Sequence, residues 1–297
     1  MSVNTGLNRV AIVGGTHGNE LTGAYLIKHF KHSPNLIKRP TFETLTIFGN
    51  PLAFKAGTRY VDKDLNRAFL TQDLNNPQLT TYEDTRAKEI YQILGNKDKP
   101  EVDFIIDIHS TTSNMQLTII IGDEDPLILK LLAHLCCINP LIKVFSWSNT
   151  QENFFLRSLS PRSIAIEMGA IPHGTIDARF FAASKQLISQ ILDFLNSYNE
   201  LKYSPVAPTV DIYRGKTIVD YPRNENGELE AMVSSNLLSQ DYQPLQPGEP
   251  IFCTFDGKEI EYTGDSVVYP VFINESSYLE KGIAMVLCEK ETVAIDS

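Results

Sequence analysis

The stretch VAIVGGTHGNE, residues 10–20, places a histidine and a glutamate directly after an apolar run and two glycines. His17 and Glu20 are three residues apart, so both side chains can face one direction on a turn or on a first helical turn. An imidazole and a carboxylate so placed suit Zn²⁺, which usually takes three protein ligands in a catalytic site and leaves a fourth position open. The pair therefore predicts a metal site that still lacks one ligand.

The third ligand is expected from the segment FIIDIHSTTSN, where His109 ends a strongly apolar run. Asp107 lies two residues earlier, on the same face of a strand, and could orient an imidazole from behind. A lone HxxE motif arises often by chance, and His109 alone could equally cap a strand or hydrogen-bond within the core. At the ends of two strands of one sheet, the two motifs together favour a metal site with two histidines and one glutamate.

Glu167 ends another apolar run, SIAIEMG, and should also emerge at the end of a strand. Burial beside an apolar wall would raise the pKa of such a carboxylate, which suits a general base that takes a proton from an attacking water. The alternative is a glutamate held in a salt bridge at the strand end. His173 follows Glu167 closely and is a further candidate ligand.

Arginines gather at two places in the sequence. One loop holds Arg59 and Arg67, with Asn66 beside the second, and such a set suits a carboxylate or an oxyanion. Arg157 and Arg162 follow later in the chain. A surface position is the alternative for any one of them, but their grouping in one loop makes an anion pocket the better interpretation of the first set.

These residues must be positioned by apolar runs that alternate with helical patterns through residues 1–203. We expect strands at residues 10–13, 45–48, 104–108, 117–121, 141–145 and 164–166. We expect helices at residues 20–30, 82–94, 127–137 and 178–198. Because the strand runs are continuously apolar, both of their faces should be covered. The order predicts an α/β fold, with a mostly parallel sheet and helices on both sides.

The pattern changes near Tyr203, where the segment YSPVAPTV resembles a linker. Beyond it, short strand-like pieces are separated by the turn signals ENGE, QPGEP and FDGKE, and no helical period of useful length follows. We therefore expect an α/β domain at residues 1–203 and a small β domain at residues 204–297.

The bulk composition excludes several classes of partner. The formal net charge of the 297 residues is −10 and no Lys/Arg-rich run occurs, which argues against nucleic acid or an anionic membrane. The N-terminus lacks the features of a signal peptide, and no apolar run approaches the length of a membrane span. Four cysteines without a CxxC motif fit reduced thiols in a cytoplasmic protein.

Taken together, these residues resemble the aspartoacylase family, a branch of the zinc carboxypeptidase-like hydrolases. The matching stretches, which follow in order along nearly the whole chain, are GGTHGNELTG at 14–23, TRYVDKDLNR at 58–67, DIHSTTSNM at 107–115, RSLSPRSIAIEMG at 157–169, DYPRNENGE at 220–228 and VYPVFINESSYLEK at 268–281. The resemblance implies a carboxypeptidase-like mixed sheet flanked by helices, a C-terminal β domain that covers part of the cleft, and a homodimer.

The resemblance also implies roles for single residues. His17, Glu20 and His109 would bind one Zn²⁺ per subunit, Glu167 would activate the water, and Arg59 would polarise the scissile amide carbonyl. Asp64 and Tyr60 would be supporting neighbours.

The remaining residues would bind the substrate. Asn66, Arg67 and Tyr278 would hold the α-carboxylate of the amino acid, and Arg157 would hold its side-chain carboxylate. Arg162 is a nearby competitor for the role of Arg157, and the sequence does not separate the two.

The family reaction is hydrolysis of N-acetyl-L-aspartate to acetate and L-aspartate, so the expected partner is a small N-acyl amino acid. Three other functions stay open at this point. A deacylase of aromatic or other neutral N-acyl amino acids would share the metal and α-carboxylate residues. A peptidase would share the metal chemistry, and a non-catalytic anion-binding module would be expected to lack part of it.

Overall fold

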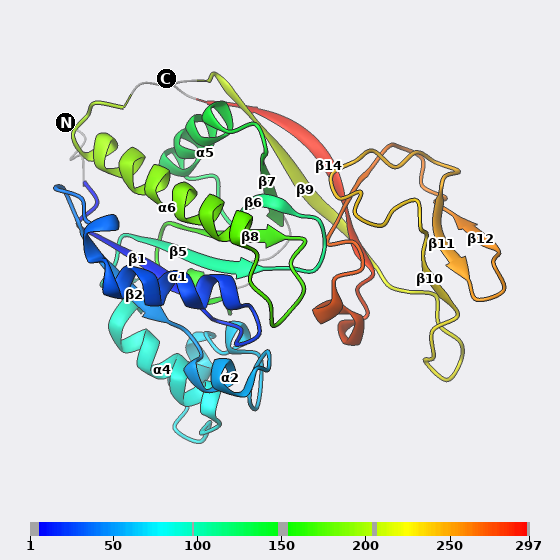
Figure 1. Ribbon diagram of the computed structural model, residues 1–297, viewed down its shortest axis with the longest axis horizontal. Coiled ribbons are helices and arrows are strands. Elements are labelled where there is room, and N and C mark those ends of the chain that lie inside the picture. The colour runs from blue at the N-terminus through cyan, green and yellow to red at the C-terminus, as the bar shows by residue number, and fades with distance from the viewer. Residues whose placement is uncertain (1–5, 97, 148–153, 204–206, 296–297) are drawn as a thin grey trace.

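A nine-stranded sheet forms the centre of the computed structural model, which describes residues 6–96, 98–147, 154–203 and 207–295 (Figure 1). The strands lie in the order β13 (Tyr269–Val271), β14 (Met285–Ala294), β9 (Thr209–Val219), β7 (Ile142–Trp147), β6 (Gln116–Ile121), β8 (Ser163–Gly169), β5 (Phe104–Ser110), β1 (Arg9–Gly14) and β2 (Glu43–Phe48). Strands β2, β1, β5 and β8 are parallel, and so are β6, β7 and β9. The predicted α/β fold is confirmed, and the sheet is mixed because β6 pairs antiparallel to β8.

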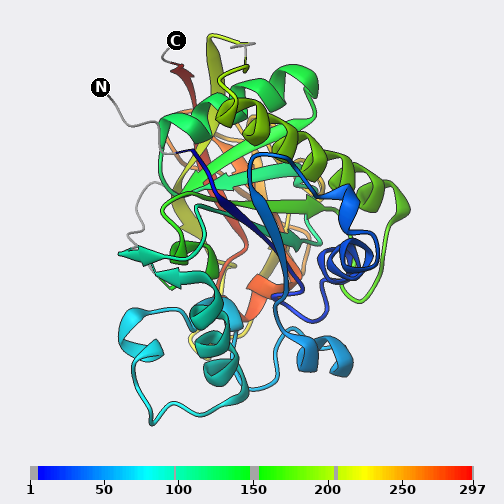
Figure 2. The ribbon, with the colours of Figure 1, turned by 90° about the vertical axis from the view of Figure 1, so that its left-hand side faces the viewer.

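Helices cover both faces of this sheet, as predicted. One face is covered by α1 (Leu21–His32), α5 (Pro126–Ile138) and α6 (Ala178–Asn199), and the other by α4 (Tyr82–Leu94). Figure 2 shows the cyan α4 and the yellow-green α6 on opposite sides of the strands. The short helices, which lie in loops and carry too few residues for a helical period, are α2 (Pro51–Ala56), α3 (Thr71–Leu74) and the 3₁₀ helices η1 (Pro34–Leu36), η2 (Leu65–Arg67), η3 (Leu156–Leu159) and η4 (Ser276–Lys281).

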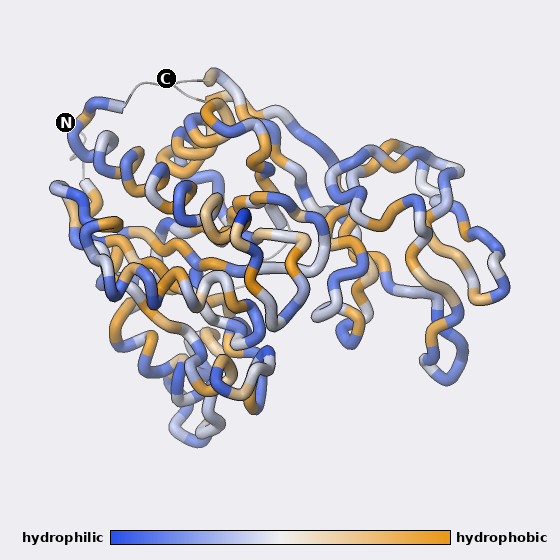
Figure 3. Tube along the Cα trace, in the orientation of Figure 1, coloured by the Kyte–Doolittle hydropathy of each residue, from blue (hydrophilic) through white to orange (hydrophobic). Residues whose placement is uncertain are grey.

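Strand β5 explains why polar residues can sit inside this core. Every one of its residues is buried, and alternate side chains face opposite sides of the sheet. Ile106 and Ile108 pack with α1, α5 and α6, whereas Ile105 packs with α4. Asp107 and His109 follow Ile105 on the α4 side, beyond the end of that apolar cluster. Figure 3 shows the apolar character of the central strands.

The C-terminal part of the chain contributes to the main sheet as well as to a smaller one. β9 and β14 form a long antiparallel pair, and β9 joins the edge of β7 in parallel. A separate three-stranded sheet, seen at the right of Figure 1, consists of β10 (Ala231–Val233), β11 (Pro250–Thr254) and β12 (Glu259–Glu261). The division at residues 203 and 204 stays a prediction, and residues 204–206 of the predicted linker lie outside the described residues.

A two-stranded hairpin, β3 (Gly95–Asn96) and β4 (Lys99–Pro100), follows α4. Of the helices in the described ranges, none is both long enough and apolar enough to cross a membrane.

Candidate active site

The loop after β1 carries the first two predicted metal ligands, His17 and Glu20, at the edge of the sheet. Gly15 has a positive φ of 72°, and a side chain on Gly14 or Gly18 would collide with the backbone of a neighbouring segment. Only glycine fits such a tight, left-handed turn at this point. The turn buries His17 and leads to Glu20, the residue that precedes α1.

Carboxylates hold both imidazoles from behind. His17 Nε2 lies 3.0 Å from Asp64 Oδ1, and His109 Nε2 lies 2.9 Å from Asp107 Oδ2. The other ring nitrogens, both Nδ1, lie 2.6 Å and 3.0 Å from the two carboxylate oxygens of Glu20. When each Nε2–H donates to its carboxylate, each Nδ1 keeps a free lone pair that faces the centre of the group.

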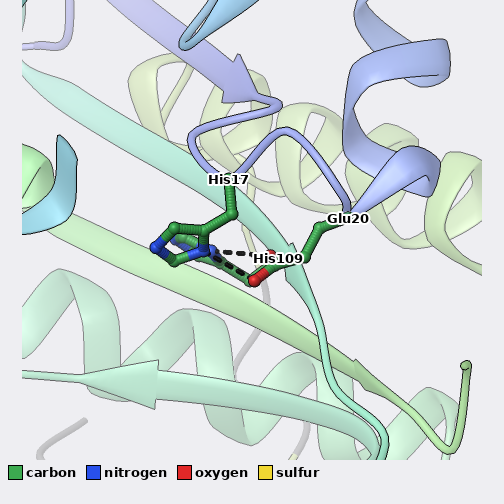
Figure 4. A group of neighbouring side chains, drawn as sticks. All are labelled: His17, Glu20 and His109. Atoms are coloured by element: carbon green, nitrogen blue, oxygen red, sulfur yellow. Dashed lines mark hydrogen bonds and ion pairs between the residues drawn. The ribbon is translucent and has the colours of Figure 1, made fainter. Parts of the chain in front are cut away.

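Figure 4 shows the imidazoles of His17 and His109 directed at Glu20. The donor atoms of these three buried residues all lie within 4.8 Å of one another. Two neutral imidazoles and one carboxylate, each imidazole backed by a carboxylate, are the donor set and outer support that a divalent transition metal requires. The predicted convergence of the three residues is confirmed, and the group fits a metal ion.

The electrostatics of the group favour a cation at its centre. Burial alone would raise the pKa of Glu20, but the charges of His17 and His109 outweigh it and hold the pKa well below its usual range. Burial would likewise lower the pKa of His109, but Asp107 and Glu20 raise it well above the ordinary histidine value. The carboxylates that pull a proton onto this imidazole also attract a metal cation.

Glu167 lies beside His109, because the two residues are paired across β8 and β5. Burial, reinforced by the negative charges of Glu20 and Glu275, raises the pKa of Glu167 well above its usual value against the opposing charge of His109. The site thus holds one carboxylate with a lowered pKa, Glu20, and one with a raised pKa, Glu167. The first suits a metal ligand and the second suits a proton acceptor.

A cavity of about 330 Å³ opens over this group. It is lined by the nine residues to which the resemblance gives a role in metal binding, catalysis or substrate binding, namely His17, Glu20, Arg59, Asn66, Arg67, His109, Arg157, Glu167 and Tyr278. Arg59 donates from Nη1 to Glu20 Oε1 at 3.0 Å, which places a guanidinium next to the metal ligands.

Two arginines share one aromatic ring at the other side of the cavity. The guanidinium carbon of Arg67 lies 4.9 Å from the ring centre of Phe155, and that of Arg157 lies 5.0 Å from it. Arg162 does not line the cavity, and its Nε donates to Asp125 Oδ2 at 2.9 Å. The geometry therefore separates Arg157 from Arg162, although the sequence could not.

The C-terminal segment supplies a wall of the cavity through η4 and the residue before it. Glu275 accepts hydrogen bonds from Thr112 N at 2.7 Å, Ser277 N at 3.0 Å and Ser277 Oγ at 2.7 Å, and from the hydroxyl of Thr111. Burial would raise the pKa of Glu275, but these donors lower it. One carboxylate thus ties η4 to the loop that follows β5.

Lys281 gives η4 a second attachment to the catalytic side. Its Nζ lies 3.3 Å from Asp64 Oδ2, on the carboxylate that also holds His17. Burial and the nearby charge of Arg59 lower the pKa of Lys281 despite the attraction of Asp64. Glu275 and Lys281 were not assigned roles from the sequence, although both fall within the stretch VYPVFINESSYLEK.

His173 has a different position from the one expected for a ligand. It is not a member of the metal-binding group in the described residues. Its Nδ1 lies 3.1 Å from Ser276 Oγ, and its Nε2 lies 3.5 Å from Glu275 Oε1. Proximity to Glu167 in sequence is misleading here, because the loop after β8 carries His173 away toward η4.

Comparisons with known proteins agree with this arrangement. Residues 6–195 match the family model described as the succinylglutamate desuccinylase/aspartoacylase catalytic domain, and residues 208–290 match the AstE/AspA barrel-sandwich hybrid domain. The chain belongs to the succinylglutamate desuccinylase/aspartoacylase family. The resemblance read from the motifs is therefore confirmed, and as a member of this family the chain is an amide-bond hydrolase.

Two curated relatives span almost the whole chain. A probable aspartoacylase from Nostoc sp. is 52% identical over 287 residues, which cover 97% of this chain and 98% of the relative. A human N-acyl-aromatic-L-amino acid amidohydrolase is 40% identical over 296 residues, which cover 97% of this chain and 92% of the relative. The names of these two relatives state different substrates, and both relatives are similar to this chain over almost its whole length.

Solved structures place the fold in the same family. Murine aminoacylase 3 superposes with a TM-score of 0.92 at 37% identity, and the match covers 98% of each chain. A succinylglutamate desuccinylase from Vibrio cholerae gives a TM-score of 0.62 at 14% identity over 97% of this chain and 81% of its own, which shows a shared fold.

Proposed function

We propose that this protein is an aspartoacylase, which hydrolyses N-acyl-L-aspartate and takes N-acetyl-L-aspartate as its substrate. The observation that carries the proposal is the pair of guanidinium groups of Arg67 and Arg157, both near the ring of Phe155, in the cavity that holds the metal-binding group. Two fixed guanidinium groups suit a substrate with two carboxylates. The 52% identity to a probable aspartoacylase supports the same substrate class.

The proposed cofactor is one Zn²⁺ per subunit, held by His17, Glu20 and His109. When bound there, the ion acts as a Lewis acid toward the amide carbonyl and lowers the pKa of water. Asp64 and Asp107 fix the ring orientation of the two histidines and increase their basicity as ligands. Both roles are consistent with the short contacts from the Nε2 atoms.

Glu167 is the proposed general base. It takes a proton from the attacking water as the new C–O bond forms, and it passes that proton to the leaving nitrogen as the C–N bond breaks. Its raised pKa suits both directions of transfer. Arg59 would donate to the oxygen on which negative charge develops, an interaction on the order of 3 kcal/mol for an oxyanion donor.

The substrate would be oriented by its two carboxylates. Asn66, Arg67 and Tyr278 would hold the α-carboxylate, and Arg157 would hold the side-chain carboxylate. Asn66 is fixed for this role by its own contact, because its Oδ1 accepts from Leu156 N at 2.9 Å. Such anchoring converts binding energy into a fixed orientation of the scissile amide.

A second candidate function is the hydrolysis of N-acyl aromatic amino acids. It is favoured by the apolar part of the cavity lining, which includes Ile120, Phe145 and Trp147. It is also supported by the 40% identity to the human amidohydrolase. Kinetics with N-acetyl-L-aspartate and N-acetyl-L-tyrosine separate the two candidates, and a large preference for the aromatic substrate would refute the first.

The proposed chemistry is tested by acetate release and metal analysis on the variant Glu167→Ala. We expect retained zinc and a rate reduced by at least about a hundredfold, the lower range for loss of a general base. The exposed Glu289→Ala variant serves as the matched control and should keep the wild-type rate. Near-normal acetate release from Glu167→Ala would remove Glu167 from its role.

We also place the protein in the cytoplasm. All four cysteines, which are Cys136, Cys137, Cys253 and Cys288, carry free thiols, as suits a reducing compartment.

A further inference from the structure

Two glycines stand beside Trp147 in one row of the central sheet. Ile120 and Ile121 of β6 pair with Phe145 and Ser146 of β7, so the next residues along these strands, Gly122 and Trp147, lie level with each other. On the other side of β7, Trp147 pairs with Gly215 of β9. The indole therefore has a neighbour without a side chain on each flank.

Each missing side chain leaves space that another residue occupies. A Cβ on Gly215 would overlap the six-membered part of the indole, so the indole lies against the backbone of β9 at this glycine. A Cβ on Gly122 would lie 2.9 Å from Arg157 Nη1, so the guanidinium lies over the end of β6. The two glycines thus leave room, on the two flanks of one strand, for an aromatic ring and for a cation.

Both of these side chains line the active-site cavity, together with Ile120 and Phe145 from the preceding row. The Phe145 and Trp147 rings are 6.1 Å apart. An aromatic and aliphatic surface therefore continues from the guanidinium of Arg157 along the floor of the cavity. N-acetyl-aspartate, whose side chain is one methylene and a carboxylate, would leave this surface without a contact.

The geometry points to a side-chain subsite with two separate determinants, in which Arg157 receives an acidic side chain and Trp147 receives an aromatic one. The inference rests on the proposed function and extends it. The enzyme hydrolyses N-acyl-L-aspartate and N-acyl aromatic L-amino acids in the same cavity, and Trp147 is the residue that sets the ratio between them. The plane of the indole can stack on an aromatic side chain, whereas it carries no positive charge to pair with a carboxylate.

The test is the selectivity ratio, defined as kcat/KM for N-acetyl-L-phenylalanine divided by kcat/KM for N-acetyl-L-aspartate. In the zinc-loaded enzyme, Trp147→Leu should lower this ratio by about tenfold, because it removes the aromatic plane. Arg157→Leu should raise the ratio by about a hundredfold, because it removes the charged partner of the aspartate side chain. Trp147→Phe keeps an aromatic plane and should restore most of the wild-type ratio.

The exposed Phe255, which does not line the cavity, supplies a matched control. Phe255→Leu makes the same type of change as Trp147→Leu and should leave the ratio unaltered. An unchanged or increased ratio in Trp147→Leu overturns the inference. Wild-type enzyme that hydrolyses N-acetyl-L-aspartate alone also overturns it but leaves the proposed function standing. Wild-type enzyme that releases no acetate from N-acetyl-L-aspartate refutes the proposed function, and the inference with it.

A binding measurement on the unmodified protein makes the test independent of the folding of any variant. Trp147 is the one tryptophan of the chain, so its fluorescence reports on this subsite alone. Addition of the product L-phenylalanine should change the emission saturably, and the product L-aspartate should compete for the change. The absence of any saturable change with L-phenylalanine contradicts contact with the indole.

Discussion

The two walls of the cavity differ in how their buried carboxylates hold the surrounding residues. On the metal side, each carboxylate supports a single imidazole, Asp64 for His17 and Asp107 for His109. On the C-terminal side, one carboxylate, Glu275, gathers donors from two segments far apart in the chain. The metal side is assembled from β5 and from loops near the ends of the central strands, whereas the C-terminal wall forms only when η4 docks on the loop after β5. Loss of a carboxylate should therefore affect metal affinity on one side and stability on the other.

The largest effect is expected at Glu275, which is 2% exposed. Glu275→Ala leaves buried donors of the loop after β5 without an acceptor, and we expect the free energy of unfolding to fall by about 3–5 kcal/mol. Denaturant titration measures it, with the exposed Glu261→Ala as control. Because the proposed zinc ligands lie on the other wall, the metal affinity of the folded variant should stay near that of the wild type. If Glu275→Ala instead weakened metal binding and left the stability unchanged, the proposed difference between the two walls would be wrong.

The next effect concerns Asp241, which joins the two walls. Its carboxylate accepts from Asn114 N on the catalytic side and from Ile273 N on the C-terminal side, both at 3.1 Å. Burial, against these hydrogen bonds, raises its pKa to about 6 from 3.8. Because the folded-state pKa is raised, this stabilisation is fully present below about pH 4 and is lost as the pH rises through about 6.

The corresponding loss is about 3 kcal/mol at 1.36 kcal/mol per pKa unit. Unfolding free energies of the wild type and of Asp241→Asn at pH 4 and pH 7 measure it. The unfolding free energy of the wild type minus that of Asp241→Asn should be smaller at pH 7 than at pH 4. A difference between the two proteins that does not depend on pH would contradict the raised pKa.

A smaller effect is expected at Asp107, behind one metal ligand. Asp107→Asn weakens the support of the His109 ring, and metal affinity should fall by about ten- to a hundredfold, measured by competition with a chelator. Asp103→Asn is the matched control at the start of the same region, where the carboxylate accepts from Asn8 N and Arg9 N. Equal affinities in the two variants would show that the outer carboxylate does not tune the site.

The smallest effect is expected at Arg162, whose contact with Asp125 lies outside the cavity. Arg162→Ala should lower stability by less than about 1 kcal/mol, as for other exposed ion pairs. Its KM for N-acetyl-L-aspartate should equal that of the wild type. A raised KM would mean that Arg162 reaches the substrate after all.

The metal side could be predicted from the sequence because its information is local. His17, Glu20, His109 and Glu167 each follow an apolar run, and the ends of neighbouring strands meet at one edge of a sheet. The long strands and helices were predictable for the same reason, since each has its own period or apolar run. Short helices such as η4 carry too little pattern to be recognised.

The resemblance implies a C-terminal domain over the cleft and a role for Tyr278, but the contacts that hold this wall could not be predicted because they depend on pairing between distant segments. Nothing in the sequence indicates that β9 joins β7, so the position of Lys281 beside Asp64 was not foreseeable. The different positions of Arg157 and Arg162 depend on Gly122 and Asp125, which lie next to the two guanidinium groups at different places. Such contacts between strands and loops produce no periodic pattern in the sequence.

The ladder between β9 and β14 restricts how a substrate can enter. It runs from Thr209 opposite Ala294 to Val219 opposite Met285, with one register shift between Leu287 and Cys288, and it belongs to the same sheet as the strands beneath the metal group. Rotation of one half of the molecule away from the other would have to rupture this ladder or its junction with β7. Admission of a substrate and departure of its products must therefore rely on rearrangement of side chains and loops around the mouth of the cavity, with the framework staying closed throughout a catalytic cycle.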